Sequence, residues 1–424
     1  MVTRYQKTQK LSFLKPLKET LAVTVDEFRH VFRDPGVLII FVAASLLYPL
    51  LYCSIYKNET LYDLPVAVVD DSQTVRSREL IRSLEATPEL KISGRFNNLG
   101  EAQNAFHRHE VHGVIRIPAD YADRINRLEQ ATVSMYSDMS SFMYYRTMML
   151  GVNYAVLDVG GNIKTERLHA QGITGESAAL AAEPMRYSDH ILYNSGMGFA
   201  SFLMPAVLIL IIHQTLFFGI GMLAGTAREE NRFHELFPVN GRRRNLIRLI
   251  AGKSLCYLSL YLVLSAYILG VIPRLFNLPH IGNPESLFGL LVPFLLATIF
   301  FSMTISIFIR NRETGMVLFL FFSLILLFLS GFSWPRSNIS GFWLAFSWLF
   351  PATHGIQGYI KINTMGATLQ QIRLEYVSLW AQAAFYFVTT LVVFWWQLAV
   401  SRRRHQPEEA SGALSGDPSA LTQP

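Results

Sequence analysis

The chain has 424 residues, of which 51% are hydrophobic and only 16% charged, and its formal net charge is +6. Soluble globular proteins carry about 25% charged residues, and several apolar runs here reach the roughly 20 residues that cross a bilayer core. These values exclude an ordinary soluble protein. The positive charge lies at predicted cytoplasmic ends, so it indicates orientation and contact with anionic headgroups rather than nucleic-acid binding.

The N-terminal region, 1–35, predicts a cytoplasmic start followed by an amphipathic helix in the membrane interface. Residues 1–16 are basic and polar and end at the helix breaker Pro16. Apolar residues then recur every three or four positions as far as Asp34-Pro35, namely Leu17, Leu21, Val25, Phe28 and Phe32. That spacing is typical of a helix with one apolar face lying in the interface. Residues 36–56 form the first predicted transmembrane helix, because the apolar run is too long for a cleaved signal peptide.

Residues 57–195 are mostly polar and predict a compact α/β domain. Strands are expected at 65–70, 90–96, 113–117 and 131–136, with helices at 76–85, 99–109, 119–128 and 141–169. Strands that alternate with helices are typical of this fold class. The Gly- and Ala-rich stretch 171–186 predicts a flexible return to the membrane. Because one span precedes it, the domain is expected on the extracytoplasmic side.

The region 196–401 predicts five further transmembrane helices, and 402–424 a disordered cytoplasmic tail. The spans are expected at about 197–224, 249–272, 286–309, 314–332 and 376–400. Arginines gather at each predicted inner end, and few occupy the outer connections. The positive-inside rule therefore favours a polytopic α-helical membrane protein with six transmembrane helices and both termini in the cytoplasm.

The apolar segment 341–360 is broken by Gly341, Pro351, Gly355 and Gly358. Its unbroken part is too short to cross a bilayer, so we interpret it as an outer re-entrant or interfacial segment. The alternative is a seventh span.

The longest polar interruption among the later spans is 225–253. Its first part has helical composition, mixes charges of both signs, and is ended by Pro238. A short amphipathic helix at about 226–238 would offer a docking surface to a cytoplasmic partner, whereas the alternative is a positive anchor that only sets topology. The candidate docking residues are Arg228, Glu229, Glu230, Phe233, Glu235, Leu236 and Phe237.

Several kinds of chemistry are not predicted. The fragment Gly252-Lys253-Ser254 lacks the first glycine of a nucleotide-binding loop, because Ile247 occupies that position. We therefore expect that this chain does not hydrolyse ATP itself, and we expect no enzyme activity, no cofactor and no metal in it. The spacing of His107, His109 and His112 fits no standard metal site and favours solvated surface histidines.

The predicted spans contain one histidine and two cysteines. His213 lies inside a span, and we expect a neutral histidine hydrogen-bonded to a neighbouring helix rather than a proton relay. Cys53 and Cys256 both fall in apolar segments and are expected to be small hydrophobic fillers.

In this order the segments resemble the membrane subunit of ABC-2 type exporters, in the subgroup with a large extracytoplasmic domain between the first and second spans. Residues 27–35 are similar to the family's N-terminal helix, 64–70 to its first outer strand and 115–121 to a later turn. The stretch 228–253 resembles the coupling helix and the span after it. The segments 329–335 and 350–354 are similar to the re-entrant segment, which includes Pro351, Thr353 and His354. The chain departs from the family at Asn231-Arg232, where Gly-Thr is usual.

The resemblance implies an ABC-2 permease in the bacterial inner membrane that exports a lipophilic or drug-like substrate. It implies a cytoplasmic ATP-binding-cassette subunit as the energy source and a second permease copy or paralogue, in a homodimer or heterodimer. A periplasmic adaptor could dock on the outer domain. The alternative function is a non-transporting membrane scaffold whose extracytoplasmic domain binds a partner.

Overall fold

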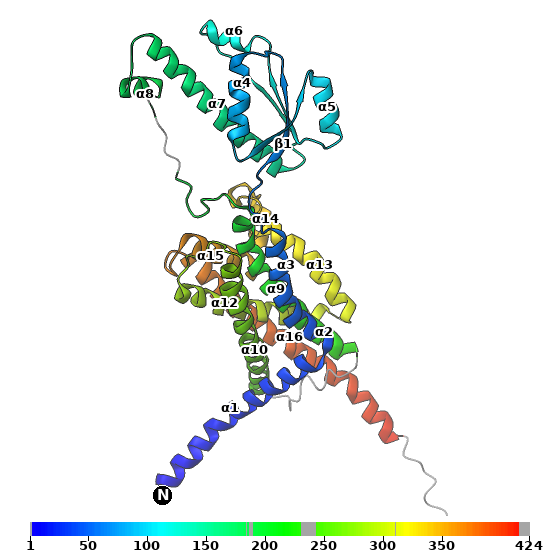
Figure 1. Cartoon of the computed structure of the whole chain (residues 1–424). Helices are drawn as coiled ribbons and strands as arrows, with labels where there is room; N and C mark the ends of the chain where they lie inside the picture. Colours follow the sequence, from blue (N-terminus) through cyan, green and yellow to red (C-terminus); the bar gives the residue numbers. More distant parts are fainter. Residues whose placement is uncertain (1, 184, 186–189, 230–242, 310, 415–424) are drawn as a thin grey trace, which may run out of the picture. The chain divides into compact units, whose positions relative to one another are not determined.

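Figure 1 shows the computed structural model of the chain, which describes residues 2–183, 185, 190–229, 243–309 and 311–414. The chain forms two compact units, one of residues Asn58–Ile191 and one of Met1–Lys57 with Leu192–Pro424. We call the first the α/β unit and the second the membrane unit, and each is described by itself.

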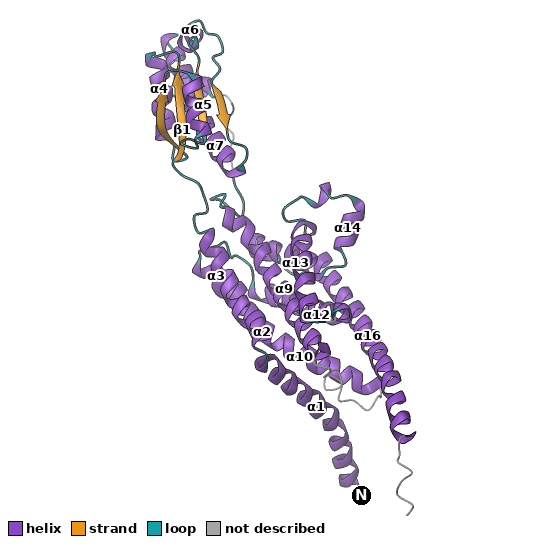
Figure 2. Cartoon of the chain, turned by 90° about the vertical axis from the view of Figure 1, so that its right-hand side faces the viewer, coloured by secondary structure: helices purple, strands orange, loops and turns teal. Residues whose placement is uncertain are grey.

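The α/β unit is built on a four-stranded sheet, drawn in orange in Figure 2. Its strands are β1 (Leu64–Asp70), β2 (Leu90–Phe96), β3 (Gly113–Ile117) and β4 (Ser134–Ser137), and their order in the sheet is β2-β1-β3-β4. β1 pairs in parallel with β2 and β3, whereas β4 is antiparallel to β3 at one edge. The four strands lie at or close to the predicted stretches.

Alternation along β1 divides the helices of the α/β unit between the two faces of the sheet. Val66 and Val68 pack on one face with residues of α4 (Val75–Ala86), α6 (Tyr121–Asn126) and α7 (Phe142–Ala170). Ala67 and Val69 pack on the other face with α5 (Leu99–His107). Neighbouring strand residues point to opposite faces, so a continuously apolar strand is buried on both sides.

The predicted flexible return differs from the structure, because it contains α8 (Glu176–Ala182). The sequence ESAALAA is rich in alanine, the residue with the highest helix propensity.

The regular elements of the membrane unit are all helices among the described residues, as expected for chains that must satisfy their backbone hydrogen bonds within lipid. In chain order they are α1 (Val2–Arg33), α2 (Pro35–Leu38), a π-helical turn (Ile39–Ala44), α3 (Ser45–Ile55), α9 (Phe199–Glu229), α10 (Arg243–Ala266), a second π-helical turn (Tyr267–Val271), α11 (Ile272–Leu275), α12 (Pro284–Ile305), a 3-10 turn (Ser306–Phe308), α13 (Arg312–Leu329), another 3-10 turn (Arg336–Asn338), α14 (Gly341–Ser347), α15 (Pro351–Met365) and α16 (Arg373–Leu414).

Five helical stretches of the described residues are long and apolar enough to cross a membrane: Pro35–Ile55, Phe199–Glu229, Leu246–Leu275, Pro284–Phe308 and Arg373–Gln397. They correspond to five of the six predicted spans. The remaining predicted span, 314–332, coincides largely with α13, part of whose side chains lie outside the described residues. The count of six therefore stays a prediction.

α9 is the central helix of the membrane unit and packs against α3, α12, α13 and α15. The first span approaches it closely at Gly219, where any side chain would overlap the ring of Phe41. Phe41 is fully buried and meets Tyr257 and Tyr261 of α10 edge to face. A glycine in α9 thus allows three helices to meet around one aromatic ring.

The N-terminal helix begins earlier than predicted, because α1 continues through Pro16. A proline removes one backbone hydrogen bond, and the leucine, lysine and glutamate residues around it are good helix formers, so this single interruption does not end the helix. The predicted end is confirmed. Asp34 Oδ1 accepts hydrogen bonds from the backbone N–H groups of Gly36 (2.9 Å) and Val37 (3.2 Å), and Pro35 starts α2.

The two faces of α1 have different surroundings. The predicted apolar face is exposed at Leu17, Leu21, Val25 and Phe32, which suits contact with lipid. The adjacent side buries Thr24, Glu27 and Val31. The buried side of this helix therefore includes a hydroxyl and a carboxylate.

The C-terminal part also differs from prediction, since α16 continues as a helix to Leu414, whereas composition predicts disorder from 402. Helix formers such as arginine, glutamate and alanine follow the span, so the helix of the span can extend through them. The segment 341–360 forms α14 and the first two thirds of α15, with a break at 348–350.

Candidate functional site

α1 and α10 pack side by side and bring polar groups together in the interior of the membrane unit. The Thr24 hydroxyl donates a hydrogen bond to the backbone carbonyl of Gly252 at 3.0 Å. A Cβ atom at Gly252 would lie 2.7 Å from Val23 and 2.8 Å from the carbonyl oxygen of Thr20. Such distances are too short for a real side chain, so the glycine at 252 permits this close approach.

Close to this contact, the same two helices form a buried ion pair. Glu27 Oε2 is 2.5 Å from Lys253 Nζ, and the two side chains are only 5% and 10% exposed. The Tyr257 hydroxyl donates a hydrogen bond to the other carboxylate oxygen, Oε1. Both oxygens of Glu27 therefore have partners from one face of α10. A buried charge without such partners would be strongly destabilising.

A second ion pair joins the same two helices nearer the surface, between Glu19 and Arg248. Its side chains are 45% and 29% exposed, so water screens it. Because Glu19 pairs with Arg248 and Glu27 with Lys253, α1 and α10 run in the same direction.

Arg228, in the last turn of α9, connects that helix to the end of α12. Its Nη1 donates to the backbone carbonyls of Ser306 at 2.8 Å and Ile307 at 3.1 Å, and also to that of Ile309. The last carbonyl groups of a helix have no partners within it, so a cation at this position satisfies them and suits the helix dipole.

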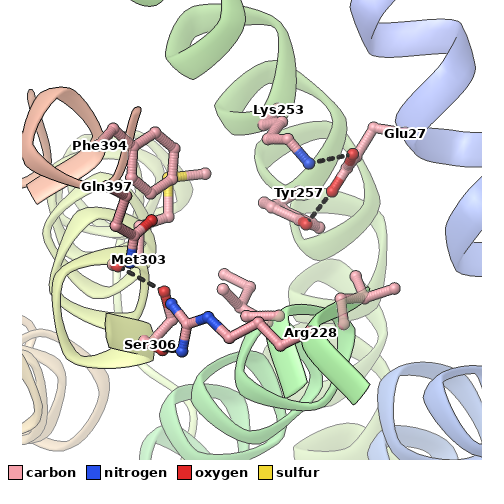
Figure 3. A pocket seen from close by; sticks show the side chains of 11 residues that line it. Glu27, Arg228, Lys253, Tyr257, Met303, Ser306, Phe394 and Gln397 are labelled. Atoms are coloured by element: carbon pink, nitrogen blue, oxygen red, sulfur yellow. Dashed lines mark hydrogen bonds and ion pairs between the residues drawn. The ribbon is translucent and has the colours of Figure 1, made fainter. Parts of the chain in front are cut away.

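The buried Glu27–Lys253 pair, Tyr257 and Arg228 line one pocket, shown in Figure 3. Its polar lining comes from α1, α9, α10, the end of α12 and α16, namely Glu27, Arg228, Lys253, Tyr257, Ser306 and Gln397. Its apolar lining is Ile220, Leu223, Ala224, Met303 and Phe394. We call this set the polar pocket. Five helices that are distant in sequence thus meet around fixed charges.

Sequence reasoning missed most of the polar pocket. The sequence places Glu27 on the interfacial helix, in the segment that resembles the family's N-terminal helix. It places Lys253 in an incomplete nucleotide-binding loop, at the end of the stretch that resembles the coupling helix and the next span, and it pairs neither residue with the other. One signal was available in the sequence. Lys253 and Tyr257 are four residues apart in a predicted span, so they share one face of a helix and indicate a polar site there.

The structure describes only the first two residues of the predicted docking surface. Arg228 and Glu229 end α9, and Arg228 belongs to the polar pocket. Glu230, Phe233, Glu235, Leu236 and Phe237 lie outside the described residues.

The three predicted residues of the re-entrant segment, Pro351, Thr353 and His354, lie in the first turn of α15 and are buried. Pro351 takes the first helical position, where a missing N–H costs nothing. The His354 ring meets Trp348 edge to face at 4.8 Å between centroids. In the described part of the chain, neither of its ring nitrogens has a hydrogen-bond partner.

The expectation of a hydrogen bond at His213 is wrong. The side chain is fully buried, and neither ring nitrogen has a partner among the described residues. Its ring instead lies near those of Phe217, Phe294 and Phe301, with centroids 6.5, 6.4 and 5.9 Å away. Phe217 lies one turn further along α9, and Phe294 and Phe301 belong to α12, so the helix that packs against α9 here presents apolar rings to the imidazole.

Comparison with known proteins places these features in a family. Residues 35–392 match the family described as ABC-2 family transporter protein. No curated protein matches the chain. ABC-2 permeases are membrane components that work with a separate ATP-binding subunit. Since the match covers most of the chain, with four of the five candidate spans among the described residues complete and most of the fifth, the chain belongs to the ABC-2 transporter family as a membrane-spanning permease.

Proposed function

We propose that the chain is the permease subunit of an ATP-driven exporter in the bacterial inner membrane, with six spans and both termini in the cytoplasm. Residues 57–195 would be the extracytoplasmic domain, and 226–238 the surface that receives the ATP-binding subunit. Two permease copies, or one copy and a paralogue, would enclose the path of a lipophilic or drug-like substrate. A periplasmic adaptor could then meet the outer domain.

The observation that carries the proposal is how the helices on either side of 230–242 are attached. α9 ends at Glu229, and its last turn is bonded through Arg228 to the end of α12. α10 begins at Arg243, and its first half is bonded to α1 through Arg248 and Lys253. A force applied to 230–242 would therefore reach four helices through charged contacts. This is the arrangement required of a segment that transmits motion from an ATPase to the spans.

The docking proposal is tested with Phe233→Ala and, as a matched control, Glu229→Ala. Truncating a buried aromatic anchor costs about 2 kcal/mol or more, about thirtyfold in affinity, whereas a rim carboxylate mainly changes the association rate. We expect Phe233→Ala to lose the ATP-binding subunit on co-purification in mild detergent and to abolish export. Glu229→Ala should show a mild, salt-dependent effect.

Two outcomes would contradict this proposal in different ways. Unchanged association in Phe233→Ala would mean that the segment only sets topology. Failure of the unmodified protein to associate with any ATP-binding subunit would support the scaffold function instead.

The proposed orientation is tested separately by labelling single cysteines in intact cells. A cysteine at Ser137 should react with an impermeant reagent, and one at Asn245 should not. The reverse pattern would refute the orientation.

A further inference from the structure

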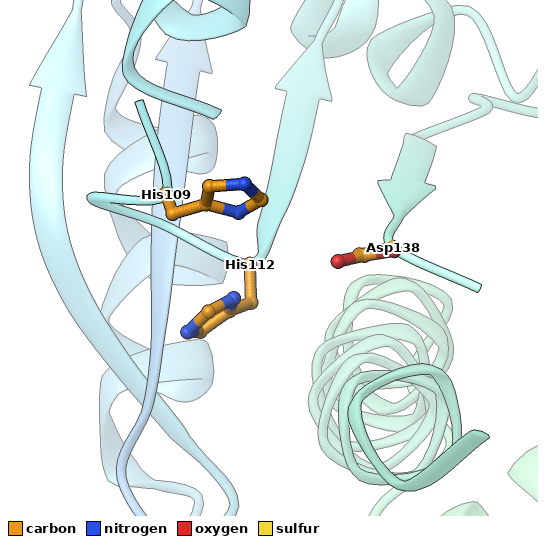
Figure 4. Close-up of side chains that lie close together, drawn as sticks. All are labelled: His109, His112 and Asp138. Carbon is orange, nitrogen blue, oxygen red and sulfur yellow. The ribbon is translucent and has the colours of Figure 1, made fainter. Parts of the chain in front are cut away.

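In the α/β unit, the turn between α5 and β3 and the end of β4 bring together two histidines and an aspartate (Figure 4). His109, His112 and Asp138 each offer one ligand atom, and the three atoms lie within 4.8 Å of one another. We propose that these residues bind a divalent transition-metal ion of the zinc type. The sequence suggested only surface histidines here, because Asp138 is distant from them in the chain.

The register of the sheet sets two of the three ligands opposite each other. Gly113 of β3 is paired with Ser137 of β4, so His112 and Asp138 are the adjoining residues. The backbone N–H of Asp138 donates to the carbonyl of His112 at 3.2 Å. The backbone N–H of His112 in turn donates to the carbonyl of Pro65 at 2.8 Å. Two ligands are thus held by backbone hydrogen bonds rather than by side-chain contacts alone.

The His112 side chain supplies an independent indication of a ligand. Its Nδ1 is buried and has no hydrogen-bond partner among the described residues. Its ring is stacked on that of Tyr144, with centroids 4.2 Å apart and planes at 23°. A buried polar atom without a partner is costly, and a bound cation nearby would offset that cost by engaging the imidazole.

The carboxylate and the exposed histidine are also arranged for binding. Asp138 Oδ1 accepts a hydrogen bond from the backbone N–H of Ser140 at 2.8 Å. Such a contact fixes the orientation of a carboxylate ligand. His109 is exposed and lies at the turn with φ of 57°, so its side chain can rotate without disturbing the core.

The ligand set selects the class of metal. Two imidazoles and one carboxylate suit zinc and its neighbours, whereas magnesium and calcium prefer oxygen ligands alone. Zinc bonds of about 2.0–2.1 Å place tetrahedral ligands about 3.3–3.4 Å apart. Rotation of the His109 side chain can bring the three atoms from within 4.8 Å to that spacing, and water would take the fourth position. The ion would then join the α5–β3 turn to the end of β4.

The test uses the full chain, purified in detergent without a histidine tag and stripped with a chelator. Zinc is titrated against a chromophoric chelator in the wild type, His109→Ala, Asp138→Asn and the control His107→Ala. His107 is exposed at the end of α5 and lies outside the cluster. Asp138→Asn keeps an oxygen that can accept from Ser140, so it tests the charge without removing the turn.

We expect the wild type and His107→Ala to bind one equivalent tightly. His109→Ala and Asp138→Asn should bind it at least about tenfold more weakly, since loss of even an outer contact costs a metal site about 10–100-fold. Replacing zinc with cobalt should give the absorption band of a tetrahedral cobalt site in the wild type and in His107→Ala only. Wild-type affinity in His109→Ala, or an equal loss in His107→Ala, would overturn the proposal. If a variant fails to fold, as judged by circular dichroism, cobalt spectra of the other variant decide the question.

Discussion

The buried ion pair between α1 and α10 gives the sharpest test of how the membrane unit is held together. Glu27→Gln removes the negative charge but keeps the size of the side chain, so Lys253 is left almost fully buried without a counter-ion. Removing one partner of a buried pair costs about 3–5 kcal/mol. Because the polar pocket adjoins the pair and glutamine can still accept from Tyr257, we expect a loss near 3 kcal/mol.

The same two helices provide the matched control, Glu19→Gln. Its pair with Arg248 is partly exposed, and such pairs contribute about 0.2–1 kcal/mol. Thermal unfolding of the purified protein in detergent should therefore show a clear drop for Glu27→Gln and little change for Glu19→Gln. Adding Lys253→Met to Glu27→Gln should restore most of the loss, because no charge then remains unpaired. Equal effects of the two single variants, or a double variant no better than Glu27→Gln, would refute the reasoning.

Two further predictions concern packing and pH. Gly219→Ala should lower the yield and the melting temperature of the protein, at a cost of about 1–3 kcal/mol or more, because the added methyl group would overlap Phe41. The control Gly270→Ala should leave both unchanged, because a methyl group there would meet no atom within 4 Å. In the α/β unit, the hydrogen bond from Arg76 lowers the pKa of Glu166 below its usual 4.5. The unfolded chain therefore takes up the proton first as pH falls, so this contribution is fully present above about pH 4.5 and is lost progressively as the pH falls through the lower pKa of the folded state. Since the pair is partly exposed, Glu166→Gln should cost less than about 1 kcal/mol at pH 7 and progressively less as the pH falls below 4.5, measured by thermal melts.

The regular parts of this structure follow from local patterns. Apolar runs of about 20 residues predict the spans because only a helix satisfies the backbone in lipid. The strand at 65–70 is predicted because a continuous apolar run bounded by turn residues suits a strand buried on both faces. Asp34-Pro35 ends α1 because the aspartate caps the following turn. Each of these predictions depends on residues that are neighbours in sequence.

The pairings within the candidate sites could not be obtained in that way. Glu27 meets Lys253, and His112 meets Asp138, through contacts between segments that are far apart in the chain. No local pattern records which distant residue will supply a partner.

In α1, the amphipathic sequence pattern does not predict which side chains are buried. In a soluble protein the apolar face of an amphipathic helix points inward, so the polar positions are taken to be solvated. Next to a membrane the apolar face can meet lipid, and the inward side is then free to carry charge if the neighbouring helix supplies the opposite sign. Glu27 is buried for this reason, and its carboxylate has partners on both oxygens. For a predicted interfacial helix in a membrane protein, each acidic residue should therefore be tested as an ion-pair partner of the basic residues in the spans before it is taken to be solvated.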